Sequence, residues 1–397
     1  MTKETVDSAI ETAVISHLHP EGSYAINGHS VPTGREEIWR FTPMRRLAGM
    51  HDQTDLVGCK YEIDLALEKD VSFEMIPLKD ERVTASGYVP TNRAAAKAWH
   101  AAERVGLLTI PAELVTNDPS AVHYVGSEQE IACAEHVVVH AQRHSKATVI
   151  LRFRGHTTSV DLAQFIVEEG ADLTVITVQG FDDDAIQLLH QHAQVGRDAK
   201  FRHINISLGG DLLRNATSVK YADTGGEAEM IGLYFVDAGE HVENRLFVDH
   251  NQPSTVSNVD YRGALQGNRA HAVWVGDVLI RKVAEGIETY ESNKNLLLTD
   301  GCRADSVPNL EIETGEIVGA GHASTTGRFD DEQLFYLESR GIPEAEAKRL
   351  VVRGFFAELV RKIGIEELEE EIMEVVEDEI AIAVANPTDE ETETQEA

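Results

Sequence analysis

The 397-residue sequence predicts a mainly β protein, in which a solenoid of short strands lies between helical ends. From about Ile131 onward, valine, isoleucine, leucine, phenylalanine and threonine come in short runs such as ATVILRF and MIGLYFV. These runs have a period near two and are separated by glycines, which is typical of strands. A weak repeat passes through them, and helical patterns occur on both sides. We therefore expect a β core with helical flanks.

The repeat consists of an alanine, usually just after a glycine, followed by one polar residue and an extended apolar run. Irregular repeats of about 20–50 residues are typical of solenoids, in which each coil buries its face on the next. A β-sandwich would also give many short strands, so it is the repeat that favours the solenoid. The repeated alanines are 28, 29, 42 and 34 residues apart: Ala171, Ala199, Ala228, Ala270 and Ala304.

Changes in composition divide the chain into four parts. The first is mixed and mainly helical: Thr33 and Glu36 have the spacing of a helix-capping box, and alanine-rich Asn92–Val105 ends at Gly106. Between them, Tyr61–Val89 contains short alternating pieces that could form strands. The predicted parts are an N-terminal mainly helical domain (1–130), the solenoid core (131–327), a C-terminal helical domain (328–385) and an acidic disordered tail (386–397).

Beyond Gly327 the chain is helical again. Pro343 can open a helix at its first turn, and the apolar residues after it fall on one face. A further segment, Ile365–Ile380, sets regularly spaced apolar residues against a series of glutamates. Such an amphipathic helix could pack on the chain's own core or in the groove of a partner, and the sequence leaves both open.

Charge and targeting signals indicate a soluble cytoplasmic protein. With 68 acidic against 35 basic residues the formal net charge is −33, which repels phosphate backbones and argues against nucleic-acid binding. The N-terminus lacks a secretory signal, and no apolar stretch approaches the roughly 20 residues that span a membrane. Cys59, Cys133 and Cys302 lie far apart with no CxxC, which suits a reducing compartment and excludes a disulfide framework.

The sequence lacks the motifs of several enzyme classes. Without G-x-x-x-x-G-K-(S/T) the chain has no P-loop and should not hydrolyse ATP itself. It has no G-x-S-x-G, and no G-x-G-x-x-G leads from a strand into a helix, so hydrolase and dinucleotide-binding functions have no support.

Two groups of histidines have spacings that deserve a test as metal sites. The first group, spaced by four, would align on a helix, but its sequence EHVVVHAQ predicts a strand. Two members of the second group would share one strand face, with the third on the next coil. For this second group we expect surface histidines. The groups are His136, His140 and His144, and His190, His192 and His203.

Two further residues could bind metal or sulfur. Cys302 follows the turn residue Gly301, and we expect a buried small hydrophobe there, although a thiol could accept sulfur or iron. His322 stands within GAGHASTT, whose side chains are too small to pack a histidine firmly. An ordinary exposed histidine would explain this pattern as well as a functional one.

Three motifs connect the chain to a known family. They are TYESNKNLLLTDGCRADSVPNLEI (Thr289–Ile312), GAGHASTTGRFDDEQLFYLESRGI (Gly319–Ile342) and TGREEIWRFTP (Thr33–Pro43). These motifs resemble the SufB/SufD family, the scaffold subunits of the Suf machinery that assembles iron–sulfur clusters. The resemblance is close over roughly the last two thirds of the chain.

The resemblance implies a right-handed parallel β-helix core and a scaffold rather than an enzyme. It implies that the ABC-type ATPase SufC docks on the segment Asp331–Ile363. ATP hydrolysis would then open an interface with SufB, where iron is combined with sulfur from a cysteine desulfurase. The implied docking residues combine aromatic and aliphatic groups with an arginine, as interface anchors do: Leu334, Phe335, Tyr336, Leu337, Arg340 and Ile342.

Within this family the chain resembles SufD more than SufB. His322 falls on a histidine that is implicated in cluster assembly at the SufB–SufD interface, which makes it the candidate ligand or acid–base group for a nascent iron–sulfur cluster. SufB-type members place a sulfur-accepting cysteine two residues earlier, where this chain has Ala320. A thiol is needed to carry persulfide, so this chain is not expected to be the primary sulfur acceptor.

Two alternatives stay open. A homodimeric SufB-like scaffold would need Cys302 as its sulfur acceptor, and the chain could pair with itself when alone. A β-helix enzyme that acts on carbohydrates would need clustered charged residues on one solenoid face. Reduced flavin is associated with some family members, so the resemblance also implies it as a cofactor, but no residue identifies its site.

Overall fold

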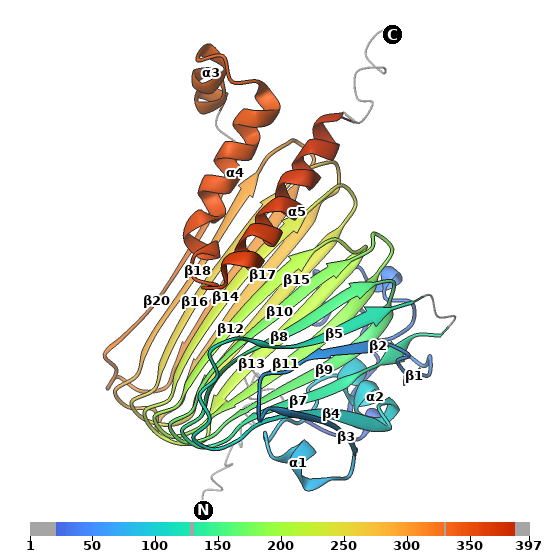
Figure 1. Cartoon of the computed structure of the whole chain (residues 1–397), viewed down its shortest axis with the longest axis vertical. Helices are drawn as coiled ribbons and strands as arrows, with labels where there is room; N and C mark the ends of the chain where they lie inside the picture. Colours follow the sequence, from blue (N-terminus) through green and yellow to red (C-terminus); the bar gives the residue numbers. More distant parts are fainter. Residues whose placement is uncertain (1–20, 128–130, 329–330, 386–397) are drawn as a thin grey trace, which may run out of the picture.

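The computed structural model describes residues 21–127, 131–328 and 331–385. Two large sheets form a long β-solenoid, and helices from the two ends of the chain lie against its outside (Figure 1). From His136 onward the chain enters the two sheets alternately, strand by strand. We call them the odd sheet and the even sheet, after the numbers of these strands. The solenoid predicted from the repeat is confirmed.

The elements have the following bounds. The 11-stranded odd sheet contains β1 (Val57–Gly58), β3 (Ser72–Pro77), β4 (Arg104–Ile110), β6 (Cys133–Ala134), β7 (His136–Ala141), β9 (Thr158–Val167), β11 (Ile186–Val195), β13 (Leu212–Tyr221), β15 (His241–His250), β17 (His271–Ile280) and β19 (Arg303–Ile312). The nine-stranded even sheet contains β2 (Glu62–Ala66), β5 (Ser120–Gly126), β8 (Lys146–Gly155), β10 (Asp172–Phe181), β12 (Lys200–Leu208), β14 (Glu227–Val236), β16 (Val256–Leu265), β18 (Glu288–Leu297) and β20 (Gly319–Arg328). The helices are η1 (Ile26–Gly28), η2 (Met44–Arg46), α1 (Glu81–Thr84), α2 (Arg93–Ala101), α3 (Asp331–Ser339), α4 (Glu344–Val360) and α5 (Glu366–Ala385).

Neighbouring coils of the solenoid stack in register. β10, for example, pairs with β12 from Asp172 opposite Lys200 to Gly180 opposite Leu208. Of the pairings described, only β2–β5 and β3–β4 are antiparallel. Because side chains alternate along a strand, each strand buries one row inside the solenoid and turns the other row outward. The period of two seen in the sequence is thus the alternation between the inside and the outside of the coils.

The interior between the two sheets holds a large apolar cluster together with buried polar side chains, such as Gln179 and Asn215, that hydrogen-bond to one another. The largest members of the apolar cluster include Phe165, Phe201 and Trp274. Two tyrosines fit only because a glycine lies opposite each of them: Tyr261 is in register with Gly232, and Tyr234 with Gly263. A Cβ atom added to either glycine would overlap the tyrosine ring. Glycine at these two positions therefore makes room for large side chains of the next coil.

The outer faces of both sheets are also covered. Residues 21–102, which we call the N-terminal segment, pack Trp39 and Trp99 against the odd sheet, where they meet Leu188 and Leu212. On the even sheet, α4 and α5 bury an apolar row that contains Phe356. The apolar face of α5 therefore packs on the chain's own sheet, at Leu368, Ile372 and Val376. No helix within the described ranges is long and apolar enough to cross a membrane.

Before residue 131 the structure is mixed rather than mainly helical. Strands β1–β5 lie there, and β4 and β5 already pair in parallel with β7 and β8 of the solenoid. The capping box at Thr33 forms, since the Glu36 carboxylate accepts a hydrogen bond from the Thr33 backbone N–H at 3.0 Å. The residues after it make turns instead of the predicted helix. The boundaries between the four parts stay a prediction.

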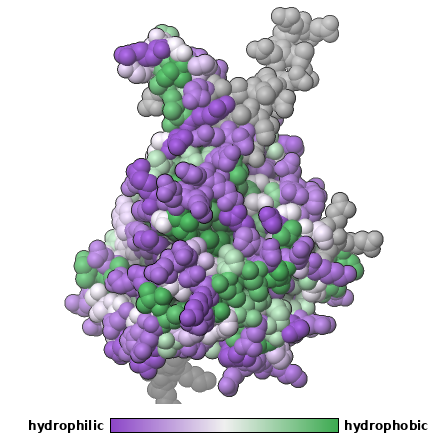
Figure 2. Space-filling view, viewed as in Figure 1, coloured by the Kyte–Doolittle hydropathy of each residue, from purple (hydrophilic) through white to green (hydrophobic). Residues whose placement is uncertain are grey.

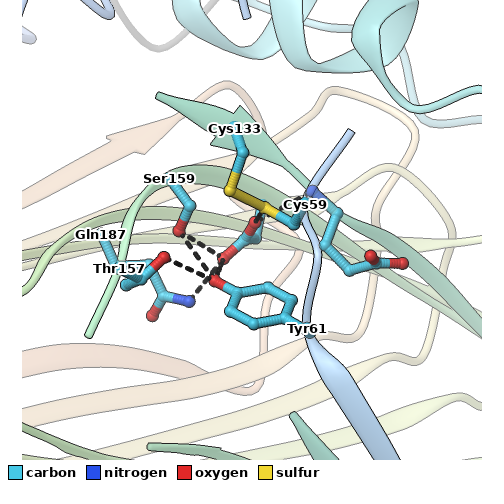
Figure 3. Close-up of a disulfide and its surroundings, with 8 residues drawn as sticks. Cys59, Tyr61, Cys133, Thr157, Ser159 and Gln187 are labelled. Atoms are coloured by element: carbon cyan, nitrogen blue, oxygen red, sulfur yellow. Dashed lines mark hydrogen bonds between the residues drawn. A yellow bond between two sulfur atoms is a disulfide. The ribbon is translucent and has the colours of Figure 1, made fainter. Parts of the chain in front are cut away.

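A disulfide links the N-terminal segment to the solenoid, which corrects the prediction made from cysteine spacing. Cys59 follows β1 and Cys133 lies on β6, and these two strands pair in parallel, so the cysteines meet despite their separation of 74 residues (Figure 3). Sequence distance was a poor guide because strand pairing sets the spatial distance. Close by, the Asp161 carboxylate accepts hydrogen bonds from Tyr61 and Gln187, at 3.2 and 2.6 Å.

Candidate functional site

His322 lies at the open end of the solenoid. It belongs to β20, which pairs with β18 on one side and with no strand on the other side within the described residues. Register sets His322 opposite Glu291, and Ser324 opposite Asn293. Side chains in register leave a parallel sheet on the same face, and both Glu291 and Asn293 are buried inside the solenoid. His322 is exposed because no further coil covers the row to which it belongs.

Glu291 is a buried acid that sequence reasoning missed. Its side chain is only 1% exposed, and burial, together with the nearby Asp277, raises its pKa to about 8. At neutral pH the carboxyl is therefore mostly protonated, so it can donate a hydrogen bond or a proton. The alternation within TYESNKN sets Glu291 on the same row as Thr289 and Asn293, and this was the signal that could have found it.

Other polar atoms near this end are buried and unpaired. Within the described part of the chain, Trp274 Nε1 on β17, Glu291 Oε1 on β18 and Ser306 Oγ on β19 have no hydrogen-bond partner. Buried polar atoms are normally paired, and these three lie on the last coils before β20. They are donors and acceptors that remain available to a ligand or to a partner at the end of the solenoid.

Cys302 lies in the turn before β19 and is half-buried. Its Sγ atom is 3.3 Å from Thr299 Oγ1 and 3.4 Å from the backbone oxygen of Gly267. Neither contact involves His322. Burial raises the pKa of the Cys302 thiol, which lowers the fraction of the nucleophilic thiolate. The Cys302 thiol is therefore less nucleophilic at neutral pH than an exposed free thiol.

The first group of histidines does not converge. His136 is buried, His140 lies 2.7 Å from a Glu168 oxygen, and His144 occupies a turn with positive φ. Across the described ranges, no three His, Cys, Asp or Glu side chains are placed to hold a metal ion. The strand predicted from EHVVVHAQ explains this arrangement, because residues four apart on a strand are too widely spaced to share one ion.

The prediction of surface histidines is wrong for the second group. His190 and His192 lie on the outer face of β11 but are buried. The ring of Tyr88, in the N-terminal segment, packs over His192. His203 points inward and stacks on Phe201, with ring centroids 6.1 Å apart. The N-terminal segment covers the odd sheet, and a single-sequence pattern does not reveal that cover.

The residues implied in ATPase docking lie on and just after α3. Phe335 is 72% exposed and Tyr336 56% exposed. The Arg340 guanidinium lies 4.9 Å from the centre of the Tyr336 ring, a cation–π contact that holds the two together. The remaining members are Leu337 and Ile342, which are half-buried, and Leu334, whose side chain lies outside the described residues.

An open groove of about 470 Å³ runs beside this aromatic pair and is lined by Glu332, Phe335, Tyr336 and Ser339. α3 stands away from the sheets, whereas α4 and α5 lie on the even sheet (Figure 1). Figure 2 shows green, hydrophobic surface near the top of the molecule, where α3 and α4 project, in addition to green patches over the lower half of the same face. Exposed aromatic anchors beside an arginine are characteristic of protein–protein interfaces.

Comparisons with known proteins agree with these features. A family model described as "SUF system FeS cluster assembly, SufBD core domain" matches residues 123–355. An iron–sulfur cluster assembly SufBD family protein of Mycobacterium tuberculosis is 45% identical over 390 residues, which cover 96% of this chain and 98% of the relative. SufD of Bacillus subtilis is 28% identical over 333 residues (82% and 72%), and SufD of Escherichia coli is 28% identical over 184 residues (46% and 43%).

Proposed function

Because the chain belongs to the SufBD family of iron–sulfur cluster assembly proteins, we propose that it is a SufD-type scaffold subunit. In this proposal a SufC-type ATPase docks on α3, and a SufB-type scaffold meets the open end of the solenoid near His322. The observation that carries the proposal is the uncovered aromatic pair Phe335 and Tyr336, on a helix that the chain's own sheets leave free. The scaffold has no catalytic step of its own.

The free edge of β20 supports the second contact. An unpaired strand edge offers a row of backbone donors and acceptors to another chain. β20 also carries His322 in register with Glu291, so a partner at this edge would enclose an imidazole beside a protonated carboxyl. Such a pair can hold iron through the imidazole and exchange a proton through the acid while a cluster is built from iron and sulfur.

A SufD-type role fits the thiols of this chain better than a SufB-type role. Ala320 stands where SufB-type members have their sulfur-accepting cysteine, and the pKa of the Cys302 thiol is raised by burial. Sulfur would therefore reach the interface on the partner scaffold, supplied by a cysteine desulfurase. Reduced flavin stays a prediction from the resemblance, to which no described residue is assigned.

Docking can be tested by light scattering on the chain mixed with SufC-type and SufB-type partners, together with the ATPase rate of the complex. We expect a defined complex with a raised ATPase rate.

Truncation of a central aromatic anchor costs about 2 kcal/mol or more, which is about 30-fold in affinity. Phe335→Ala and Tyr336→Ala should each weaken ATPase binding to that extent. Val375→Ala, at an exposed position on α5, is the matched control and should bind normally. A chain that stays alone would refute the docking role.

His322 can be tested separately in the assembled complex. His322→Ala should leave the complex intact and slow the appearance of iron–sulfur absorbance about tenfold, because a ligand or proton donor would be lost. His100→Ala, another exposed histidine, is the control and should have no effect. Cluster formation at the normal rate in His322→Ala would assign this histidine an ordinary surface role, while the docking result would still stand.

A further inference from the structure

A cavity of about 360 Å³ lies between the outer face of the odd sheet and the N-terminal segment. It is far in sequence from His322 and from α3, and its features do not depend on the function proposed above. Strands β11, β13 and β15 contribute its floor. Ile38 and Tyr88 of the N-terminal segment contribute its opposite wall. The cavity therefore exists only where the first part of the chain folds back over the middle of the solenoid.

The floor is hollow because one small residue lies between larger ones. Ala216 on β13 is in register with His190 on β11 and with Arg245 on β15. Two residues earlier along β13, on the same outward row, lies Arg214. The alanine thus leaves a space that an imidazole and two guanidinium groups surround.

The side chains that line this cavity are more basic than the protein as a whole. Its lining includes four permanent cations and two carboxylates, whereas the whole chain has a formal net charge of −33. Asp249 pairs with Arg281 at 2.6 Å and Lys220 is exposed, whereas Arg214 and Arg245 share the single carboxylate of Glu243. The cations are Arg214, Lys220, Arg245 and Arg281, and the carboxylates are Asp249 and Asp277.

Two buried polar atoms of the lining have no partner among the described residues. Arg214 Nη1 is unpaired although the side chain is only 2% exposed, and so is Nε2 of His190. The other nitrogens of Arg214 are in use: Nε lies 3.3 Å from Glu243 Oε1, and Nη2 donates to the Ile38 carbonyl at 2.8 Å. The guanidinium is therefore held in place, with both N–H groups of Nη1 uncommitted.

Protonation states fix what this cavity can bind. Burial lowers the pKa of Arg214 to about 10, which still leaves it charged at neutral pH. Burial, with a contribution from Arg214, lowers the pKa of His190 to about 3, so this imidazole is neutral. The available partners for a ligand are thus a cationic donor and a neutral imidazole nitrogen, which suits an anionic group with several oxygens.

The rest of the lining combines apolar and aromatic side chains with small polar residues such as Thr91 and Ser218. Tyr88 lies 5.6 Å from the His192 ring, centre to centre, and Phe247 also lines the cavity from the outward row of β15. A ligand with an organic body would bury that body against these side chains, while its charged group reached the arginines. Volume and lining together suit a small organic molecule better than an inorganic ion alone.

We propose that this cavity binds a small organic anion, whose phosphate or carboxylate group is held by Arg214 and Arg245 beside His190, and whose apolar body packs against Tyr88. A carboxylate is planar and a phosphate is tetrahedral, and the oxygens of both groups can accept paired hydrogen bonds from a guanidinium group. The site would also fasten the N-terminal segment to the solenoid, because a ligand in the cavity contacts both.

Calorimetric titration and thermal unfolding of the full chain test this proposal. The probes are phenyl phosphate and benzoate, with benzyl alcohol as the neutral control. We expect saturable binding of at least one anion, a raised Tm in its presence and no binding of the alcohol. The stronger of the two anions identifies the acid group. Absence of saturable binding for both anions at millimolar concentration, or equal binding of the alcohol, would overturn the proposal.

Two variants locate the binding. Ala216→Phe fills the hollow and should abolish binding while the chain stays folded, because Ala216 is only partly buried. Arg245→Gln removes a charge-assisted hydrogen bond and should weaken binding about tenfold or more. Arg197→Gln, at an exposed arginine paired with Asp223, is the matched charge control and should bind as the unmodified chain does. Unchanged binding in Ala216→Phe would place the anion elsewhere and refute the assignment, even if Arg245→Gln failed to fold.

Discussion

Replacing Glu243 by alanine is expected to lower the free energy of unfolding by about 3–5 kcal/mol, because it leaves buried cations without their counter-charge. Glu243 is fully buried on β15, with one carboxylate oxygen 3.3 Å from Arg214 Nε and 3.1 Å from Arg245 Nη1. Its second oxygen accepts a hydrogen bond from Thr42 Oγ1 at 2.6 Å. One carboxylate thus pairs with two arginines and fastens the N-terminal segment.

The Glu243 carboxyl should also make the stability of the fold depend on pH. Burial alone would raise the pKa of the Glu243 carboxyl, but Arg214, His241 and Arg245 hold it well below the usual range. Its contribution to stability is therefore complete above the unfolded-state pKa of about 4.3 and is lost as the pH falls below that value toward the folded-state pKa. In Glu243→Ala the free energy of unfolding should therefore fall less steeply as the pH is lowered through this range.

Urea unfolding at pH 7 and at a series of acidic pH values measures both effects. Glu288→Ala, at an exposed carboxylate at the start of β18, is the matched control and should change stability by no more than about 0.5 kcal/mol. A loss below about 1 kcal/mol for Glu243→Ala would mean that the two arginines find other compensation, and the buried ion-pair cluster would not stabilise the fold as described.

Removal of the disulfide is the second large effect that we expect. Cys59→Ser with Cys133→Ser should lower the free energy of unfolding by about 2–4 kcal/mol, since the bond closes a loop of 74 residues in the unfolded chain. The bond also ties β1 to β6, at the point where the N-terminal segment joins the first coil.

Chemical denaturation with and without a reducing agent measures this contribution. The reductant should destabilise the unmodified chain and have no effect on the double serine variant. Cys302→Ser removes the one cysteine outside the bond and should leave the response to the reductant unchanged. Three titratable thiols in the native, untreated chain would show that the bond is absent, and stability would then not depend on the reductant.

The strands could be predicted from the sequence because every coil must bury one row of side chains inside the solenoid. In most strands the row that faces the interior is largely apolar and closely packed, which gives a period of two over runs of about ten residues. The helices at the C-terminal end carry an equally regular signal. α5 shows the limit of such a prediction. Its apolar face was evident in the sequence, but only the structure shows that Ile372 packs on the even sheet.

The errors have a common cause, which is contact between segments that are distant in sequence. His190 and His192 were expected on the surface because nothing in β11 indicates that the N-terminal segment covers it. Cys59 and Cys133 were kept apart by their spacing, while β1 and β6 bring them together. Glu291 was missed because a buried acid breaks the alternation on which the strand prediction relies. The site residues His322 and Phe335 depended on family motifs, since an exposed residue leaves no periodic trace.

The stacking of coils in register has a consequence for the order in which the molecule can form during synthesis. Each coil contacts the one before it, so the solenoid can grow from its first coil as the chain emerges, by closing loops of about 30 residues. The N-terminal segment does not share this order. The hydrogen bond between Thr42 and Glu243 cannot form until a residue 201 positions later has been synthesised. The contact between Arg46 and Asp211 likewise spans 165 positions. The N-terminal segment is thus synthesised before the solenoid but makes these contacts only after residues 211 and 243 have been added, and until then the odd sheet keeps an uncovered apolar face.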